Sequence, residues 1–173
     1  FEVDRAELDH AFKKYFDLKA YERWGSLLRD SPDLLTDYVR EGMEYAATLT
    51  AVDHHDTVAW IERYRAYMRT VFERYDLLMS PTLATTAFRC ADGPPGEIGG
   101  VPVENPDWAW TPFTYAVNMA GNPAASIPCG FDSRGLPIGL HVVGRMEDEA
   151  AVLAASAAYE RAHPWSGRRP PVS

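Results

Sequence analysis

Four residues near the middle of the chain have the side-chain types that small-molecule pockets use. Trp108, Thr111, Tyr115 and Asn118 are spaced by three or four positions, so a helix through all of them would place them on one face. Interior helices usually carry stripes of leucine, isoleucine and valine, whereas this face combines aromatic area with a few groups that form orienting hydrogen bonds. Two interpretations stay open: the wall of a substrate pocket, or an interior helix whose polar groups are satisfied.

Other groups have catalytic residue types but lack the spacing that their chemistry requires. His54 and His55 lie between Asp53 and Asp56, and all four are residue types that bind metals. Adjacent helical positions diverge by about 100°, and no HExxH spacing is present. We therefore predict a solvated helix start here, and no metal site.

Ser126 and His141 could act as nucleophile and base from neighbouring strands. However, Ser126 lies in no GxSxG turn, and His141 alternates with apolar residues as a sheet residue does. Cys129 follows a proline and is predicted to be a small packing residue. The three lysines lie on an ordinary amphipathic helix: Lys13, Lys14 and Lys19. No catalytic residue is therefore assigned.

The composition is that of an ordinary globular protein. The 173 residues suit one domain, and 46% of them are hydrophobic. A formal net charge of −8 lacks the basic surface that a nucleic-acid partner requires, and the basic residues of 161–169 are interrupted by prolines. No apolar run approaches the roughly 20 residues that span a bilayer. We predict neither a nucleic-acid nor a membrane partner.

Cysteine usage favours a cytoplasmic protein. Cys90 and Cys129 form no CxxC pair, which indicates reduced thiols, although a disulfide between them stays an alternative.

The first half of the chain is predicted to be helical. Helical spacing extends over residues 6–30, then from a helix start at Ser31-Pro32 to about residue 49, and then from a cap at Asp53 to residue 75. Residues 76–80 are short, apolar and followed by Pro81, which predicts a buried strand.

The second half is predicted to contain a long loop and a hairpin. Prolines and glycines throughout residues 81–110 predict a loop that is functional or mobile. A short helix should begin at Thr111 or Pro112 and end near Gly121. Strands are expected over 124–129 and 137–144, joined by a glycine-containing turn, with a bulge at Pro128. The last helix should begin with acidic residues 147–149 and pack through its small side chains: Ala150, Leu153, Ala154 and Ala157.

This order of elements predicts the α/β class, with a sheet that is incomplete in this chain. We expect a helical part over 1–75, a part with the strands and hairpin over 76–165, and a tail over 166–173. Because Phe1 already lies in structured sequence, we expect the chain to be a truncated portion of a longer protein.

Several motifs between residues 72 and 165 resemble the C-terminal signature of the amidase signature family. In chain order they are Tyr75-Asp-Leu-Leu-Met-Ser-Pro-Thr82, Phe113-Thr114 with Asn118-Met-Ala-Gly-Asn-Pro-Ala124, Ile127-Pro-Cys-Gly-Phe131, and Gly135-Leu-Pro-Ile-Gly-Leu140 with Val143-Gly-Arg145. Each motif alone is weak, but their common order makes coincidence improbable. His141 is a departure, because many members have glutamine there.

The resemblance implies the C-terminal portion of an α/β/α fold around a mixed sheet. Family members hydrolyse carboxamides with a Ser–Ser–Lys triad and without a metal or organic cofactor. The triad should lie upstream of these residues, so this portion would supply scaffold and pocket wall.

The resemblance also selects between the two interpretations of the mixed aromatic and polar face. In family members, residues before the NxxG element face the acyl side of the substrate, and these positions correspond to Trp108, Thr111 and Tyr115. A tRNA-dependent branch of the family has an acidic residue where this chain has Thr111. A neutral aryl or alkyl amide is therefore the expected small-molecule substrate.

Two rival functions stay open. The chain could be a non-catalytic truncated paralogue that acts as a binding or interaction module, or part of a tRNA-dependent amidotransferase, which Thr111 disfavours. A homodimer is also expected, because an incomplete sheet exposes strand edges.

Overall fold

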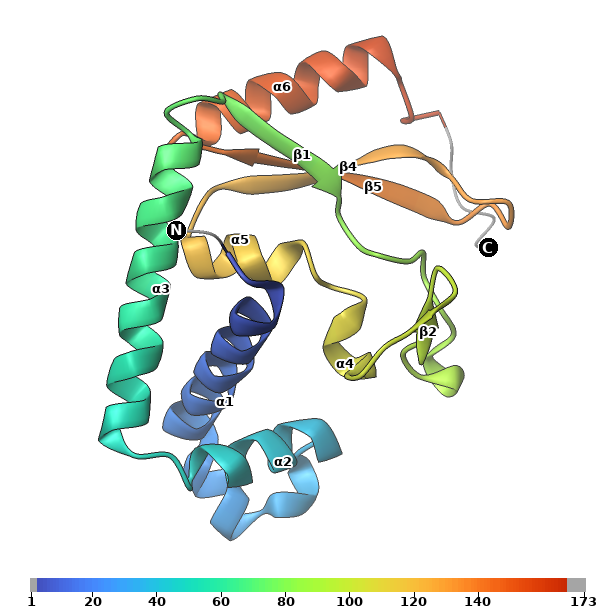
Figure 1. The fold of residues 1–173 in the computed structure, drawn as a ribbon. Helices are drawn as coiled ribbons and strands as arrows, with labels where there is room; N and C mark the ends of the chain where they lie inside the picture. The colour runs from blue at the N-terminus through green and yellow to red at the C-terminus, as the bar shows by residue number, and fades with distance from the viewer. Residues whose placement is uncertain (1–2, 168–173) are drawn as a thin grey trace. The chain divides into compact units, whose positions relative to one another are not determined.

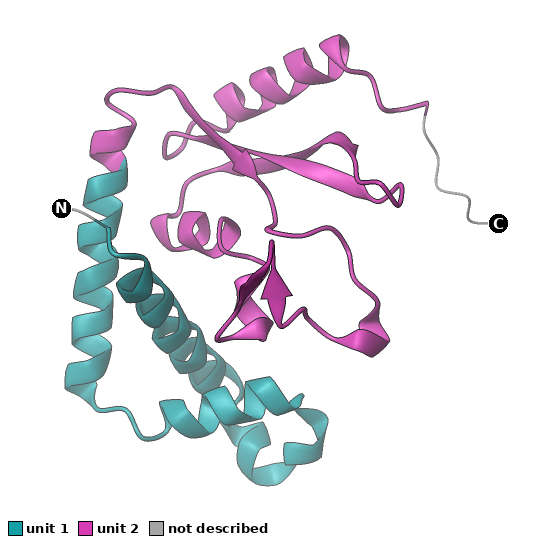
Figure 2. Ribbon diagram, turned by 45° about the vertical axis from the view of Figure 1, so that its right-hand side comes forward, with its two compact units in different colours: residues 1–68 teal, residues 69–173 magenta. Residues whose placement is uncertain are grey.

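The computed structural model describes residues 3–167 and contains helices and strands along one chain (Figure 1). Two compact units divide the chain, residues 1–68 and 69–173 (Figure 2). The predicted tail over 166–173 lies largely outside the described residues.

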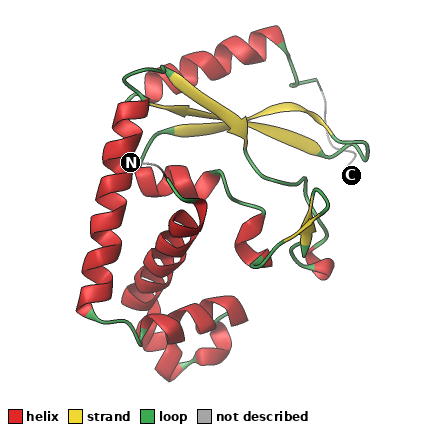
Figure 3. Ribbon diagram, in the orientation of Figure 1, coloured by secondary structure: helices red, strands yellow, loops and turns green. Residues whose placement is uncertain are grey.

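The first unit is helical, as its spacing predicts (Figure 3). Its elements are α1 (Arg5–Asp30), the short 3₁₀ helix η1 (Pro32–Leu34), α2 (Asp37–Ala46) and most of α3 (Ala51–Val71). A single helix from Ser31 is wrong, because the Ser31 hydroxyl donates to the carbonyl of Asp30 and caps no helix. The second long helix begins instead after Thr36.

Helix α3 begins with a reciprocal pair of capping hydrogen bonds. The Asp53 carboxylate accepts from the Thr50 backbone N–H at 3.0 Å, and the Thr50 hydroxyl oxygen accepts from the Asp53 N–H at 3.2 Å. Thr50 is therefore the capping residue, and Asp53 lies inside the first turn. The sequence predicted this helix but assigned the cap to the wrong member of the pair, so its predicted start is three residues late.

The second unit is built on a three-stranded antiparallel sheet. Its strands are β1 (Leu77–Pro81), β5 (Pro137–Gly144) and β4 (Ala124–Phe131), in that spatial order. Because β5 is central, His141 pairs with Ser80 on one side and with Ser126 on the other. All three strands were predicted, and the mixture of helices and strands confirms the α/β class.

The β4–β5 hairpin has the two irregularities that its sequence predicts. The pairing register shifts between Pro128 and Gly130, which is the expected bulge. Gly135 has a φ of 81° in the connecting turn, a conformation that other residues rarely adopt. Together they fix which side chains of the hairpin share a face.

Helix α6 (Glu149–Ala162) covers one face of this sheet, and α5 (Thr114–Ala120) lies on the other side (Figure 1). Val152 packs in a core cluster with Ile127 and Val142, and Ala155 and Tyr159 pack against that cluster. The predicted packing face of α6 was wrong. Leu153 is 66% exposed, and the three alanines expected with it are exposed as well.

Residues 81–110 contain more structure than their composition predicts. They form the 3₁₀ helix η2 (Cys90–Asp92), the paired strands β2 (Glu97–Ile98) and β3 (Val101–Pro102), and helix α4 (Pro106–Ala109). Gly99 and Gly100 have φ values of 62° and 82°, which suit the two-residue turn between β2 and β3.

Outer strands and exposed apolar side chains predict that the isolated chain associates. Within the described residues β1 and β4 are the outer strands of the sheet, and Met79 on β1 is 60% exposed. Unpaired edges and apolar surface favour contact between copies. We expect dimers or larger aggregates at micromolar concentration in sedimentation velocity. A sharp monomer boundary with cooperative thermal melting would contradict this expectation.

Every helix in the described part of the chain is too short or too polar to cross a membrane.

Candidate functional site

The three predicted substrate-binding residues lie on three successive pieces of structure. Trp108 is in α4, Thr111 is in the turn that follows, and Tyr115 is in α5. The helix is interrupted between residues 109 and 114, so no single helix face holds all of them. Tyr115 is buried, whereas Trp108 and Thr111 are half-buried.

Thr111 is nevertheless fixed to Trp108 by two hydrogen bonds. The backbone N–H and the hydroxyl of Thr111 both donate to the Trp108 carbonyl oxygen, each at 3.0 Å. These bonds satisfy a carbonyl at the end of the short helix α4 and hold the turn toward α5. The assignment of Trp108, Thr111 and Tyr115 to a substrate pocket stays a prediction.

A cavity of about 650 Å³ is lined by Trp110 of the same region but by none of these three residues, and we call it the Thr82 cavity. It is bounded by residues 82–88, by Trp110, by Ser126 and Pro128 of β4, and by residues 137–139 of β5. Its volume is within the range of about 300–1,000 Å³ that small-molecule pockets occupy. All of its lining residues belong to the second unit.

Backbone hydrogen bonds hold the segment after β1 over the sheet. The Thr82 N–H donates to the Gly139 carbonyl at 2.8 Å, and the Ala84 N–H donates to the Trp110 carbonyl at 3.0 Å. Farther along, the Phe88 and Trp110 rings meet edge to face with centroids 5.5 Å apart. The cavity therefore has an aromatic side that is attached to the α4 region.

Two of the residues that line the cavity, Thr82 and Ser126, carry hydroxyl groups. The Thr82 and Ser126 side-chain oxygens are 2.7 Å apart and hydrogen-bonded. Both lie over Gly139, where a Cβ atom would be 2.5 Å from the Ser126 oxygen and 2.6 Å from the Thr82 oxygen. Gly139 lacks a positive φ. It is therefore space for the hydroxyl pair, and not backbone conformation, that requires glycine at this position.

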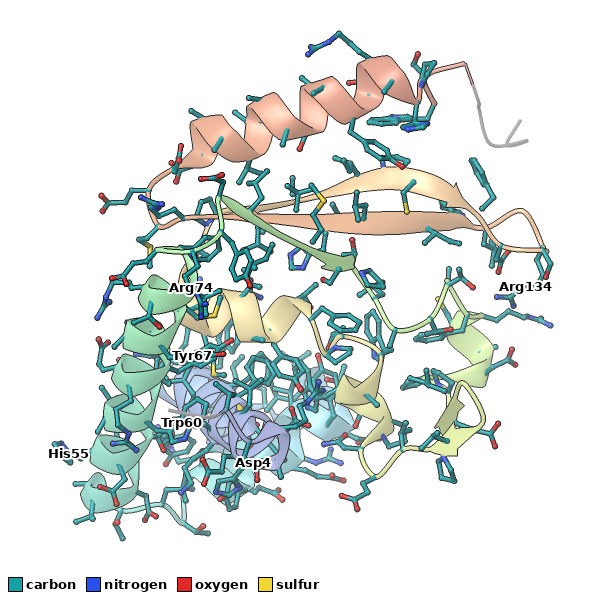
Figure 4. All side chains as sticks on the ribbon, turned by 45° about the horizontal axis from the view of Figure 1, so that its top comes forward. Asp4, His55, Trp60, Tyr67, Arg74 and Arg134 are labelled. Atoms are coloured by element: carbon teal, nitrogen blue, oxygen red, sulfur yellow. The ribbon has the colours of Figure 1, made fainter. Side chains whose placement is uncertain are left out.

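A charged network fixes the far end of the same segment. The Thr86 hydroxyl donates to the Asp132 carboxylate at 2.8 Å and accepts from Arg134 at 2.8 Å. Arg134 extends from the hairpin turn (Figure 4) and also donates to Asp132. The Leu136 backbone N–H foremost, and then Thr86 and Arg134, lower the pKa of Asp132 to about 2. Asp132 therefore keeps its negative charge throughout the ordinary pH range.

Ser126 and His141 do not form a nucleophile–base pair, as the sequence predicts. Ser126 is bonded to Thr82, and His141 Nδ1 is buried without a hydrogen-bond partner in the part of the chain that the structure describes. The His141 side chain is 5% exposed, and burial lowers its pKa. His141 is therefore a neutral interior residue at neutral pH.

His141 should make the stability of the protein depend on pH. Because the folded-state pKa is lowered, the unfolded chain binds a proton more readily, so stability falls as the pH drops below about 6.5 toward the folded-state pKa. The limiting slope is about 1.4 kcal/mol per pH unit. We expect His141→Gln to flatten the profile of unfolding free energy between about pH 5 and 7. Parallel profiles for wild type and variant would contradict this prediction, because they would show that His141 has the same pKa in the folded and the unfolded chain.

The remaining candidate groups have other partners. Lys13, Lys14 and Lys19 pair with the carboxylates of Asp17, Asp53 and Glu22. His54 and His55 are exposed. Among the described residues no group of three or more metal-ligating side chains could hold an ion.

Cys90 and Cys129 are both free and exposed, so no disulfide joins them, and Cys129 is less buried than a packing residue should be.

Comparison with known proteins identifies the family. The family model described as Amidase matches residues 24–153, which is most of the chain. The chain therefore belongs to the amidase signature family, as its motifs predict.

Individual relatives match the chain over part of their own length. An acylamidase from Rhodococcus erythropolis is 36% identical over 138 residues, covering 78% of this chain and 28% of the relative. A glutamyl-tRNA(Gln) amidotransferase subunit from Moorella thermoacetica is 44% identical over 106 residues, covering 61% of this chain and 20% of the relative. The chain thus spans less than a third of these curated relatives.

The fold is also found in solved amidase structures. A bacterial aryl acylamidase of the amidase signature family aligns with a TM-score of 0.79 and 26% identity, over 97% of this chain and 37% of the other. A second structure, described as an amidase, aligns with a TM-score of 0.81 and 22% identity over 90% of this chain. The chain corresponds to about a third of that fold.

Sequence reasoning missed the Thr82 cavity. Its lining comes from one continuous segment and from three separate places in the chain, so no helical or strand spacing marks it. One usable signal was Gly139, because a glycine inside a predicted strand often marks a place where other groups approach the backbone closely.

Proposed function

We propose that the complete protein containing this chain hydrolyses carboxamides whose acyl side is neutral, such as aryl or alkyl amides. In this proposal the Ser–Ser–Lys triad lies upstream of the chain, and the present residues supply scaffold and part of the acyl-pocket wall. The similarity of residues in this chain to an acylamidase at 36% identity is the observation that carries the proposal. Family membership over residues 24–153 supports it.

Trp108, Thr111 and Tyr115 are the proposed wall residues. They combine two aromatic side chains with two hydroxyl groups, those of Thr111 and Tyr115, and carry no formal charge. Such a surface favours a neutral, apolar acyl group and disfavours a charged one, because a charge that leaves water without a partner costs free energy. We propose a cytoplasmic enzyme, since both cysteines are free thiols.

A second candidate function is that of a component of a tRNA-dependent amidotransferase. It is favoured by the 44% identity to the amidotransferase subunit from Moorella thermoacetica. Thr111 weighs against it, because a neutral hydroxyl cannot form an ion pair with the ammonium group of an amino-acid substrate. The two candidates are distinguished by comparing kcat/KM of the complete protein for an aryl amide, such as acetanilide, with that for free glutamine. Preference for glutamine would favour the amidotransferase function.

The isolated 173-residue chain should not hydrolyse amides. Within the described residues we find no serine or cysteine that is hydrogen-bonded to a side chain able to act as its general base: Ser126 is bonded to Thr82, and His141 Nδ1 has no partner. We expect no turnover of acetanilide by the isolated chain, measured as aniline release, and multiple turnovers by the complete protein. Turnover by the isolated chain that is abolished by Ser126→Ala would contradict this assignment.

A further inference from the structure

The Thr82 cavity has a lining without charge. Its residues are apolar or carry hydroxyl groups, and within the described residues it has no acidic or basic side chain in its wall. An ionised ligand would leave water here without a partner, which is unfavourable. The cavity therefore selects a neutral ligand.

The shape and chemistry of the walls favour an aromatic ring. The Phe88 and Trp110 rings, which meet edge to face at 87°, line the cavity together with Pro128 and Ile138. Aromatic rings pack well in offset or edge-on contacts with such surfaces. Rigid prolines and the paired rings also leave few side chains to immobilise on binding, which reduces the entropic cost.

The Thr82–Ser126 hydroxyl pair can form hydrogen bonds with a ligand. Thr82 and Ser126 share one hydrogen bond at 2.7 Å, so one hydroxyl proton remains to donate, and lone pairs remain to accept. Gly139 keeps this pair open, because a Cβ atom there would contact both oxygens. A single polar substituent on the ring can therefore be satisfied at the root of the cavity.

The cavity is formed before a ligand arrives. Thr82 is bonded to β4 and β5, and Thr86 is bonded to Asp132 and Arg134 at the hairpin turn. The covering segment is thus held at both ends. Preformed walls of this kind are typical of small-molecule sites.

We propose that the Thr82 cavity binds a neutral aromatic ring with one hydrogen-bonding substituent, the aryl part of the substrate of the proposed amidase. The ring lies between the Phe88–Trp110 side and Ile138, and its substituent contacts the Thr82–Ser126 pair. This assignment rests on the proposed function for the identity of the ligand, and on the cavity for its location.

The test measures binding of two matched probes to the complete protein by fluorine NMR. 4-Fluorophenol carries the polar substituent, and 4-fluorotoluene has the same shape without it. Gly139→Ala should weaken both probes about tenfold, because the added methyl displaces the hydroxyl pair into the cavity. Ser126→Ala keeps the space, and should weaken 4-fluorophenol about fivefold while leaving 4-fluorotoluene unchanged.

Gly130→Ala is the matched control on the same hairpin. A Cβ at Gly130 meets nothing within 4 Å, and Gly130 has no positive φ, so both probes should bind as they do to wild type. 4-Fluorophenol should also raise KM for acetanilide without changing kcat. Absence of probe binding, equal effects of Ser126→Ala on both probes, or binding without competition would each overturn the proposal. Hydrolysis of acetanilide is scored separately, so its absence would instead overturn the proposed function.

Discussion

Replacing Thr111 by aspartate in the complete enzyme is expected to lower kcat/KM for neutral aryl amides by about one to two orders of magnitude, or about 1.4–2.8 kcal/mol. Thr111 is half-buried and bonded to the Trp108 carbonyl. A carboxylate at this position would lie beside aromatic side chains without a partner, or would take up a proton. An amide with a cationic group on its acyl side should lose much less, because it can pair with the new charge.

The comparison is made between substrates on the same protein, because a folding defect would depress both equally. Thr111→Val is the matched control: it keeps the shape and neutrality of the side chain and removes the hydroxyl. We expect it to change kcat/KM less than the aspartate variant does. Equal losses for neutral and cationic amides in Thr111→Asp would remove Thr111 from the pocket.

Replacing Phe72 by alanine should cause a large loss of stability, about 3–5 kcal/mol. The Phe72 side chain is 2% exposed, and it is among the largest fully buried side chains of the chain. Its removal deletes apolar contacts and leaves a cavity that the surroundings cannot fill completely. The Phe72 carbonyl, which accepts from Arg145 at 2.8 Å, belongs to the backbone and remains in the variant.

Tyr75→Ala provides the control, because Tyr75 is 56% exposed and only three residues away. We expect it to change stability by about 0.5 kcal/mol or less. The measurement is the urea midpoint of the complete protein for each variant. Similar midpoints for Phe72→Ala and wild type would contradict this prediction, because they would show that the Phe72 side chain is not part of the hydrophobic core of the complete protein.

The sheet could be predicted from the sequence because its signals are local. Residues 77–81 and the two strands of the hairpin are bounded by proline and glycine, and Gly135 marks the turn. The bulge at Pro128 follows from the missing N–H of proline. Each of these features depends on backbone chemistry that a single residue determines.

Helix faces were harder to predict because they depend on the neighbouring element. α6 has alanines on several sides, so its periodicity does not distinguish the buried face. Gly144 determines which face of α6 is buried, because a Cβ atom there would be 2.6 Å from the Val152 side chain. The absence of that atom allows close approach at Val152, and Leu153 consequently faces outward.

The assignment of the pocket wall stays a prediction, but its geometric premise was wrong. Spacing placed four residues from Trp108 to Asn118 on one helix face, whereas Pro112 and the hydrogen bonds of Thr111 divide that region into two short helices. The Thr82 cavity depends on the hydrogen bond between Thr82 and Ser126, which are 44 positions apart. Contacts of this kind arise from strand pairing and leave no pattern within either segment.

The most direct test of the pocket assignment is a crystal structure of the complete protein with a bound, non-hydrolysed neutral aryl amide. We predict that its acyl group lies in van der Waals contact, within about 4 Å, with Trp108, Thr111 and Tyr115. An acyl group bound elsewhere, with these three side chains packed only against protein, would contradict the account.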